Sequence, residues 1–313
     1  MTTRGHFFCR RCSATSDVLN KSEFCDRCAE ECMRRKALIG DAKLTIAEFL
    51  MNFPHTYEPI PGFVYSSQRM SELVGYIRRV ASANRATILI SGESGVGKEL
   101  VALALHLMNP LRNEGPFKVA DCGTMLNRDL FTSELFGHRK GVFTGAVSNR
   151  AGLFSEADGG TMFLDEISTL DLDMQSALLR VIQERSYRPV GNGLGDIKFD
   201  GQIIAATNED LETLVKQGRF RKDLFFRLNV IRIRVPPLRE RIMDLPGLVR
   251  YYLDRNDKRH VTLTGNALDI LSRHSWWGNI RELNNVLERL FLVHDGSGPI
   301  TEKYLTYEVF DCV

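Results

Sequence analysis

The sequence has no long hydrophobic run and no excess of charge of one sign. None of its apolar stretches approaches the roughly 18 residues that a membrane-spanning helix needs, and the first residues lack the apolar core of a secretory signal. The 41 Lys and Arg residues are balanced by 39 Asp and Glu, so the net charge of +2 gives the protein as a whole no polyanion-binding character. Any contact with nucleic acid would therefore be local. These absences predict a cytoplasmic protein that does not enter a membrane.

Cysteine is scarce outside the N-terminal segment, since five of the seven cysteines fall within the first 32 residues. The odd total and the absence of a secretory signal argue against a disulfide framework. The segment contains two C-x-x-C pairs, and each pair can offer two thiolates from one turn. We therefore predict a structural zinc site. Its expected ligands are Cys9, Cys12, Cys25 and Cys28.

The zinc interpretation has competitors. A redox dithiol, an iron–sulfur site or unmetallated thiols would use the same cysteines. Cys32 and His6 lie close enough in sequence to substitute for one ligand. Zinc is favoured because so short a segment cannot bury a useful core, and a metal would supply the folding energy.

Four regions follow one another along the chain. Residues 1–35 form a zinc-ribbon-like module, and residues 36–61 form a helix and a proline-rich linker. Residues 62–237 alternate helical patterns with short apolar runs at 87–91, 161–165 and 202–207, which predicts an α/β domain with a parallel sheet between helices. Residues 238–313 form a small all-helical domain, with helices expected at 245–253, 264–274 and 279–293.

A phosphate-binding loop (P-loop) is expected between the first predicted strand and the helix that follows it. The sequence there fits G-x-x-x-x-G-K, with Lys98 placed to reach the outer phosphates. Glycines let backbone N–H groups converge on phosphate oxygens, and the helix N-terminus adds a favourable dipole. The candidate nucleotide-binding residues are Gly92, Glu93, Ser94, Gly95, Val96, Gly97, Lys98 and Glu99.

Two carboxylates end the strand predicted at 161–165. Asp165 is placed to hold Mg²⁺, directly or through water, and Glu166 to orient and polarise an attacking water. Glu99 stands where many P-loops have a Ser or Thr that binds the metal, so the metal would depend more on Asp165. Together the two motifs predict an ATPase.

Four further segments carry a resemblance. They are Glu134-Leu-Phe-Gly-His-Arg-Lys-Gly141-Val-Phe-Thr-Gly-Ala146, Ala205-Ala-Thr-Asn208, Gly218-Arg-Phe-Arg221-Lys-Asp-Leu-Phe-Phe-Arg227-Leu-Asn229 and Trp276-Trp-Gly-Asn-Ile-Arg281-Glu-Leu283. With the P-loop and the acidic strand, they make residues 60–293 similar to the AAA+ domain of bacterial enhancer-binding proteins, which activate sigma-54 RNA polymerase. The resemblance covers about three-quarters of the chain, and it implies an AAA+ fold with a helical lid domain.

The resemblance also implies roles for these segments. Phe143 and Thr144 would contact the sigma factor from the tip of a mobile loop. Arg221 and Arg227 would reach the γ-phosphate bound to a neighbouring subunit, so the resemblance implies a homo-oligomer, expected to be a hexameric ring. Asn208 would hold the attacking water or sense the γ-phosphate. Arg281 would couple the lid to the nucleotide.

Three positions depart from the family pattern. Val142 replaces the usual Ala of the loop, and Trp277 replaces a usual Pro ahead of the last helix. Asp121 stands where many relatives carry an Asn that restrains the catalytic glutamate. An aspartate near Glu166 would hold a proton, pair with a cation or repel Glu166, and the restraint would then be weaker or pH-dependent.

The sequence thus predicts an oligomeric ATPase that remodels closed complexes of the sigma-54 RNA polymerase holoenzyme, with ATP, Mg²⁺ and structural Zn²⁺ as cofactors. The alternatives are an AAA+ remodeller of another client and a nucleotide-stabilised scaffold that acts through the zinc ribbon. The family typically ends in a DNA-binding helix-turn-helix, for which the residues after 293 leave no room. Either the chain then works from solution, or the zinc ribbon tethers it to promoter DNA or to another protein.

Overall fold

The computed structural model describes residues 63–305, with gaps at 84, 126, 143–147, 192–194, 257, 259–260 and 295–297. It also describes the backbone of two short N-terminal strands, β1 (Phe7–Phe8) and β2 (Thr15–Ser16), which pair antiparallel. The four cysteines predicted to bind zinc, the helix expected within 36–61, and Phe143 and Thr144 lie outside the described residues.

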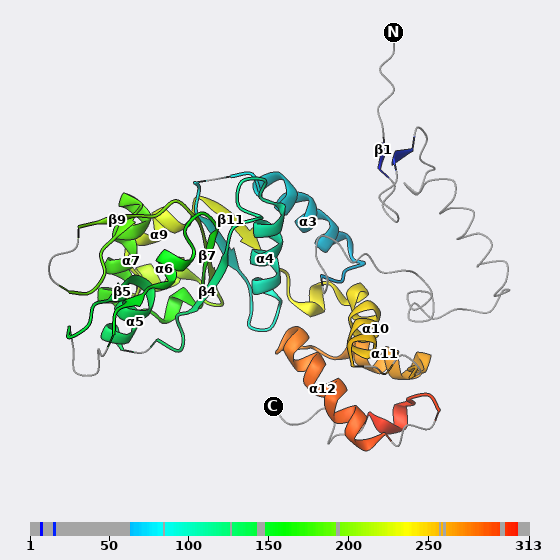
Figure 1. Cartoon of the computed structure of the whole chain (residues 1–313). Helices are drawn as coiled ribbons and strands as arrows, with labels where there is room; N and C mark the ends of the chain where they lie inside the picture. The colour runs from blue at the N-terminus through cyan, green and yellow to red at the C-terminus, as the bar shows by residue number, and fades with distance from the viewer. Residues whose placement is uncertain are drawn as a thin grey trace, which may run out of the picture.

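Five parallel strands form the central sheet of the first domain (Figure 1), in the order β11-β3-β10-β7-β4. Each is a short run of mostly apolar residues, as expected of strands covered on both faces. Their bounds are β3 (Ile88–Ser91), β4 (Phe117–Asp121), β7 (Thr161–Asp165), β10 (Gln202–Thr207) and β11 (Ile231–Arg234).

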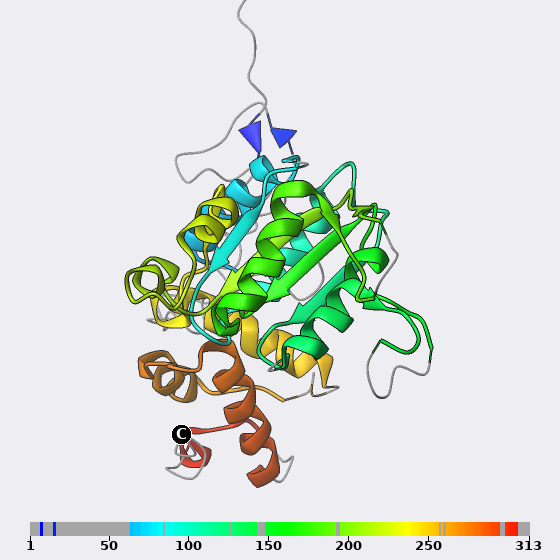
Figure 2. The same cartoon turned by 90° about the vertical axis from the view of Figure 1, so that its left-hand side faces the viewer.

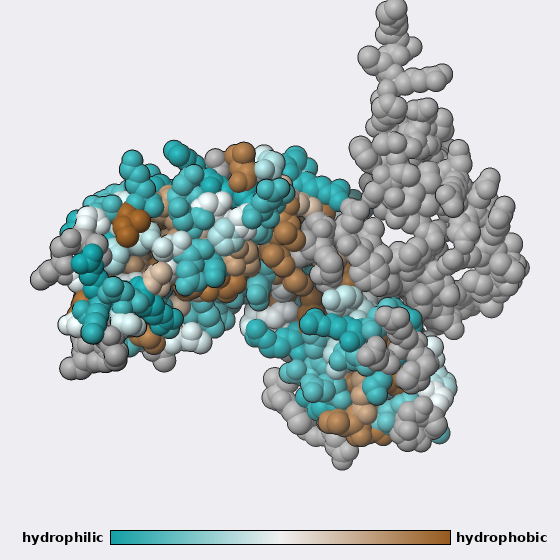
Figure 3. Space-filling model, in the orientation of Figure 1, coloured by the Kyte–Doolittle hydropathy of each residue, from teal (hydrophilic) through white to brown (hydrophobic). Residues whose placement is uncertain are grey.

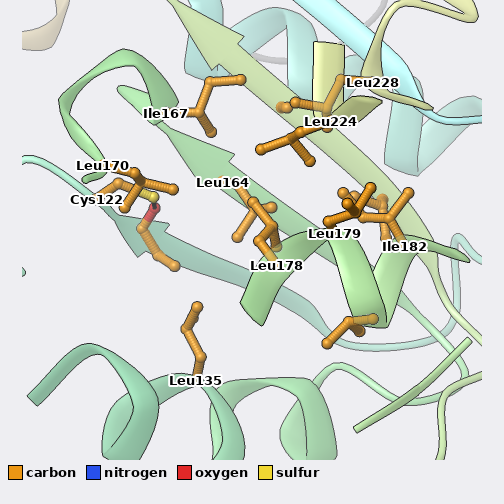
Figure 4. Packing of buried hydrophobic residues seen from close by; sticks show 14 of the residues in the cluster. Cys122, Leu135, Leu164, Ile167, Leu170, Leu178, Leu179, Ile182, Leu224 and Leu228 are labelled. Atoms are coloured by element: carbon orange, nitrogen blue, oxygen red, sulfur yellow. Dashed lines mark hydrogen bonds between the residues drawn. The ribbon is translucent and has the colours of Figure 1, made fainter. Parts of the chain in front are cut away.

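Successive residues of a strand enter two different hydrophobic cores, because side chains alternate between the faces of a sheet. Ile88 and Ile90 of β3 join one core, which they share with α3 (Gln68–Val80) and α4 (Lys98–Met108). Leu89 joins the other core. Figure 4 shows part of that second core, where Leu164 of β7 lies among leucines of the covering helices.

Helices cover both faces of the sheet. Figure 1 shows α3 and α4 on one side and α5, α6, α7 and α9 on the other. Local sequence fixes where several of them begin: Ser67, Asn127 and Asp171 accept hydrogen bonds from the first turns of α3, α5 and α7. The helices of the second side are α5 (Arg128–Phe136), α6 (Leu153–Glu156), α7 (Leu172–Glu184), α8 (Leu211–Lys216) and α9 (Lys222–Leu228).

Two small hairpins extend from the side of α5 and α7. One joins β5 (Gly137–His138) to β6 (Arg150–Ala151), and the other joins β8 (Ser186–Tyr187) to β9 (Ile197–Lys198). The hairpins contact each other, since Val190 N donates to the Gly137 carbonyl and Arg139 N donates to the Val190 carbonyl. The loop predicted to contact the sigma factor therefore emerges from the first hairpin.

A helical domain follows the sheet domain. It begins with the 3₁₀ turns η2 (Leu238–Glu240) and η3 (Ile242–Asp244) and continues through α10 (Leu245–Arg255), α11 (Gly265–Arg273), α12 (Asn279–Val293) and η4 (Glu302–Tyr304). Its core is separate and surrounds the fully buried Trp276. Figure 2 shows α12 leading away from the sheet domain.

Hydrophilic residues predominate on the face seen in Figure 3, and hydrophobic residues show there only in small patches. No helix within the described residues is long and apolar enough to cross a membrane.

The predicted fold class is confirmed: a parallel sheet between helices is followed by a helical lid. The strands expected at 161–165 and 202–207 and the helix expected at 279–293 have the expected bounds. The edge strands β4 and β11 and both hairpins were not predicted. Each is short or half exposed, so it lacks the apolar run that marks a buried strand.

Candidate active site

Polar residues from four neighbouring strands meet at the carboxyl edge of the sheet. The parallel register places Asp121 of β4 opposite Asp165 of β7, and Thr207 of β10 opposite Ser91 of β3. Ligands of open α/β sheets bind at this edge. The register therefore brings the P-loop and both acidic positions together, although they are far apart in sequence.

The P-loop (residues 92–98) connects β3 to α4 through two glycines with positive φ. Gly95 has φ 76° and Gly97 has φ 99°, a conformation that other residues rarely adopt. Gly92 is needed for space, because a Cβ there would lie 2.9 Å from the Val235 carbonyl oxygen. The loop leads directly into the N-terminus of α4, which is the geometry of an anion site.

Lys98 is the first residue of α4 and is 8% exposed. Its ammonium donates to the carbonyl oxygens of Gly92 at 2.9 Å and Glu93 at 3.2 Å. Burial lowers the pKa of Lys98, while the carboxylates of Asp165 and Glu166 oppose that shift. Lys98 is thus a cation held at the centre of the loop, where phosphate oxygens would bind.

Glu166 follows β7 in the left-handed region, with φ 54°. Its N–H donates to Asp165 Oδ1 at 2.9 Å, and the turn η1 (Ile167–Thr169) begins after it. A left-handed conformation is uncommon for glutamate, and such positions cluster at functional sites. No sequence pattern predicted this turn.

Asp121 lies beside Glu166. A Cβ placed on Gly123 would lie 2.7 Å from Glu166 Oε2 and 3.2 Å from Asp121 Oδ1, so both carboxylates flank that one point. Asp121 Oδ1 also accepts a hydrogen bond from Gly123 N at 2.9 Å. The structure thus places the Asp121 and Glu166 carboxylates close together, as the hypothesis about Asp121 requires. The effect of Asp121 on catalysis stays a prediction.

Cys122 is buried next to this acidic group. Burial raises the pKa of its thiol to about 12, and the charges of Asp121, Asp165 and Glu166 add to the shift. The thiol is therefore neutral at physiological pH, which excludes it as a nucleophile.

Asn208, the predicted sensor of the γ-phosphate, follows β10 and accepts a 3.4 Å hydrogen bond from Ser168 Oγ in η1. Ser168 lies two residues after Glu166. Thr207 instead bonds locally: its hydroxyl donates to the Glu209 carbonyl and accepts from Glu209 N. Thr207 thus caps the strand, and Asn208 is the member of the pair that reaches the turn after Glu166.

The two arginines predicted to act in a neighbouring subunit lie in different environments. Arg221 is not part of a continuous helix with Arg227, because it is the N-cap of α9 and its N–H donates to Gln175 Oε1 at 2.8 Å. Its guanidinium pairs with Asp223 and also donates to Ser176 Oγ. The Asp223 carboxylate raises the pKa of Arg221.

Arg227 is exposed on α9, and its guanidinium has no hydrogen bond or ion pair within the part of the chain that the structure describes. It is therefore available to a second molecule. Gln175, which the sequence analysis missed, holds the segment before α9 in place: it is fully buried, and its amide donates to the carbonyls of Leu170 and Arg219.

The start of α12 rests on the P-loop. Arg281 Nη1 donates to Ser94 Oγ at 2.8 Å, and Ile280 N donates to the Gly95 carbonyl at 3.0 Å. The approach is so close that a Cβ on Gly95 would lie 2.3 Å from the Gly278 carbonyl oxygen. Arg281 thus reaches the phosphate-binding loop, as its predicted role requires.

Two further residues of the helical domain hold the P-loop and were missed in the sequence. Arg239 forms two hydrogen bonds with the Glu93 carboxylate, and Asn279 donates to it as well. The bonds from Arg239 are the main cause that lowers the pKa of Glu93. Arg239 lies in none of the motifs quoted above, and Asn279 lies in the Trp276–Leu283 segment, which did not indicate its contact with Glu93.

A small apolar pocket, with free space of about 20 Å³, lies beside the P-loop. Residues before and within α3, the P-loop, α4 and the helical domain line it, so it lies where the two domains meet. The lining includes Phe63, Val64, Val96, Leu248 and Ile280. Apolar walls next to a phosphate loop suit a flat aromatic base.

Val142, at the start of the predicted sigma-contacting loop, packs on the second hairpin. A Cβ on Gly191 would lie 2.8 Å from Val142 Cγ2, and Gly191 has φ 129°. The larger side chain of Val142 therefore occupies space that is open because residue 191 is a glycine. Position 191 gave no signal in the sequence analysis.

Metal ligands are few among the described residues: no group of three or more His, Cys, Asp or Glu side chains there could hold an ion. Asp165, the expected Mg²⁺ ligand, fits the preference of that ion for one or two carboxylates completed by phosphate and water oxygens. Glu99 is exposed in the first turn of α4.

Comparison with protein families gives two matches. A family described as "Sigma-54 interaction domain" matches residues 63–234, which is more than half of the chain. A family described as "AAA+ ATPase lid domain" matches residues 239–311. The two matches correspond to the sheet domain and the helical domain.

Curated relatives are similar over the same region. The DNA-binding transcriptional regulator NtrC of Bradyrhizobium sp. (strain RP501 Parasponia) is 48% identical over 237 residues, which are 75% of this chain and 48% of that protein. The Nif-specific regulatory protein of Azotobacter vinelandii is 48% identical over 235 residues, which are 74% of this chain and 44% of that protein. The chain thus spans about half the length of these relatives.

Solved structures agree in fold. The crystal structure of NtrX from Brucella abortus has a TM-score of 0.71 and 31% sequence identity, and the match covers 92% of this chain and 62% of that one. The same NtrX protein has been solved in complex with ADP and in complex with ATP.

Proposed function

The chain belongs to the family of sigma-54 interaction domains with an AAA+ lid, and from this premise we propose that it is an oligomeric ATPase that remodels sigma-54 RNA polymerase. The observation that carries the proposal is the convergence at the carboxyl edge of the sheet. There the cation of Lys98 lies within the electrostatic influence of Asp165 and Glu166, and the lid arginine Arg281 touches the same loop.

ATP would occupy both the P-loop and the apolar pocket. The triphosphate would accept hydrogen bonds from the backbone of residues 92–98 and from Lys98, which now donates to two carbonyls of its own loop. The base would lie against the apolar side chains of Val96 and Ile280, and the small pocket between them would have to widen to receive it. The NtrX complexes with ATP and ADP support this choice of ligand.

Hydrolysis would depend on Glu166 and Asp165. Glu166 would orient a water for in-line attack on the γ-phosphate and accept its proton. Asp165 would hold Mg²⁺, which neutralises charge on the β- and γ-phosphates when it is bound. Asn208, linked to the catalytic turn through Ser168, would sense the γ-phosphate.

The active site would be completed by a neighbouring subunit. Arg227 is exposed and lies on α9, a different element from those that form the P-loop. A head-to-tail arrangement of copies would bring this cation to the next subunit's phosphates and would close into a ring, for which we propose six subunits. Arg221 would serve the same interface once it is released from Asp223.

The first hairpin would transmit force to the sigma factor through Phe143 and Thr144. Its base is anchored at α5 and contacts the second hairpin through Val190. Movement that begins in the nucleotide site could reach the loop along this path. We propose the sigma-54 holoenzyme as the client because the family is defined by that interaction.

The first test is ATP turnover by the purified protein over a range of concentrations, with and without sigma-54. We expect specific activity to rise with concentration, because Arg227 acts only across an interface, and we expect a nucleotide-dependent complex with sigma-54. Lys98→Ala is the matched control and should neither bind ATP tightly nor hydrolyse it.

Two outcomes would contradict the proposal. Turnover that is independent of concentration and occurs without sigma-54 binding would indicate an AAA+ machine with another client. Tight ATP binding without turnover would indicate a nucleotide-stabilised scaffold or a missing activating partner.

For the N-terminal segment we propose a structural Zn²⁺ held by Cys9, Cys12, Cys25 and Cys28, with promoter DNA or another protein as the partner of that segment. The support is the spacing of the two C-x-x-C pairs. We expect about one zinc ion per chain in elemental analysis, lost when Cys9 and Cys12 are changed to serine and retained in Cys312→Ser. Iron with visible absorbance, or no metal, would refute the zinc site.

A further inference from the structure

The carboxylate of Glu93 is bound by the lid. Arg239 Nη1 and Nη2 donate to its two oxygens at 2.7 and 2.5 Å, and Asn279 Nδ2 donates to Oε2 at 3.2 Å. A bidentate arginine–carboxylate pair fixes direction as well as distance. The second residue of the P-loop is therefore tied to the helical domain.

Asn279 adds a second connection at the same place. It is fully buried, and its amide donates to the Ser94 carbonyl at 3.0 Å, while its Oδ1 accepts from Leu238 N at 2.8 Å. Its φ of 56° places the side chain on the loop at the first residue of α12. One amide thus joins the P-loop, the interdomain segment and the lid.

Trp277 covers Arg239. The guanidinium carbon of Arg239 lies 5.4 Å from the centroid of the Trp277 ring, which is within the range of a cation–π contact. Trp277 is 71% exposed, so packing in the lid core does not account for its position. Trp276, its neighbour in sequence, is fully buried and donates to the Leu271 carbonyl.

We propose that Arg239 and Trp277 are positioning residues for nucleotide binding, which act on the P-loop through Glu93 and make the Trp277 indole a reporter of nucleotide occupancy. The inference rests on the proposed ATPase function of the same site. Trp277, Arg239 and Glu93 are linked in series. The Trp277 indole contacts the Arg239 guanidinium, and this guanidinium donates two hydrogen bonds to the Glu93 carboxylate.

Arg239 and Trp277 would matter for nucleotide binding because phosphate oxygens compete with loop carbonyls for the Lys98 ammonium. Its ammonium now donates to the carbonyls of Gly92 and Glu93, and phosphate oxygens would take those hydrogen bonds. After that exchange the Glu93 side of the loop is held by Arg239 and Asn279 on the lid. Trp277 and Arg239 therefore keep the P-loop in its nucleotide-binding conformation while Lys98 exchanges carbonyl oxygens for phosphate oxygens. The lid, which is bonded to the loop, moves with it.

The test is a titration with ADP, followed by tryptophan fluorescence and, independently, by calorimetry. We expect the wild-type emission to change on binding, and we expect Trp277→Phe to lose this change while it keeps wild-type affinity, since a phenyl ring also stacks on arginine. Trp277→Ala should weaken ADP binding by about two- to fivefold. Arg239→Lys should weaken it in the same direction, because lysine cannot form the bidentate pair.

Steady-state turnover separates positioning from general destabilisation. Trp277→Ala should raise KM for ATP with kcat unchanged, whereas Trp277→Phe restores KM. The matched control is Leu292→Ala, which removes an 81% exposed side chain near the other end of α12 and should leave both constants unchanged.

The inference is overturned if Trp277→Ala binds ADP as the wild type does, or if the emission change persists in Trp277→Phe. A protein that binds ADP with these responses but does not hydrolyse ATP would support the inference and refute the proposed function. The two failures are therefore distinguishable.

Discussion

Glu166→Gln is expected to reduce ATP turnover by about 100- to 10,000-fold, the usual contribution of general-base catalysis, while ATP binding persists. Glutamine has nearly the same size as glutamate and can occupy the same left-handed turn, where the backbone N–H donates to Asp165. Its neutral amide cannot take a proton from water. Binding depends on the P-loop and the apolar pocket, which this substitution does not touch.

The control for this prediction is Asp121→Asn, which changes the neighbouring carboxylate to an amide at constant size. If Glu166 is the base, the Asp121 variant keeps measurable turnover, and any change in its rate reports the restraint that position 121 exerts on Glu166. If both variants lost ATP turnover completely, the combined negative charge of Asp121 and Glu166 would be what matters, and Glu166 would have no separate role as a base. Near-normal turnover in Glu166→Gln would remove Glu166 from the mechanism.

The second large effect is expected for Arg227→Ala, which should lower turnover by about 1,000-fold or more if this arginine stabilises the transition state across an interface. Within the described residues Arg227 has no hydrogen-bond or ion-pair partner, so its loss should not destabilise the fold. Lys216→Ala, which removes another exposed cation from the neighbouring helix α8, is the matched control and should retain activity.

Mixing the two inactive variants tests the position of the arginine directly. In a mixed ring, a subunit with Arg227→Ala still has Glu166, and a neighbour with Glu166→Gln still supplies Arg227. About a quarter of the interfaces would then be complete if copies assemble at random and head to tail. Recovery of activity on mixing supports catalysis across the interface. Absence of recovery, with assembly verified, would place Arg227 in its own subunit's site.

Much of the fold was predictable because its strands are short apolar runs with polar residues at their carboxyl ends. β7 and β10 have this form and their bounds were anticipated, as was the length of α12. The position of Lys98 followed from the glycine spacing. In each of these cases the determining interactions lie within a few residues of one another in sequence.

The contacts that escaped prediction join distant segments. Arg239 and Glu93 are 146 residues apart, and Asn279 and Glu93 are 186 apart, so no periodicity or motif relates them. The segment before α9 is positioned by a distant contact in the same way, because Gln175 of α7 accepts the Arg221 N–H from 46 residues away. Such bonds are set by packing of the whole domain, which local sequence does not encode.

The order of the strands also governs how the protein can form during synthesis. β3, which leads into the P-loop, pairs with β11 on one side and with β10 on the other, and both neighbours are translated long after it. Ile88 meets Ile204 only when the intervening chain has emerged, which takes several seconds at ~5–20 residues per second. Until then the backbone N–H and C=O groups along both edges of β3 have no native partner. The nascent chain must therefore be kept from aggregating over this interval, and a pause in translation before residue 207 would lengthen the exposure.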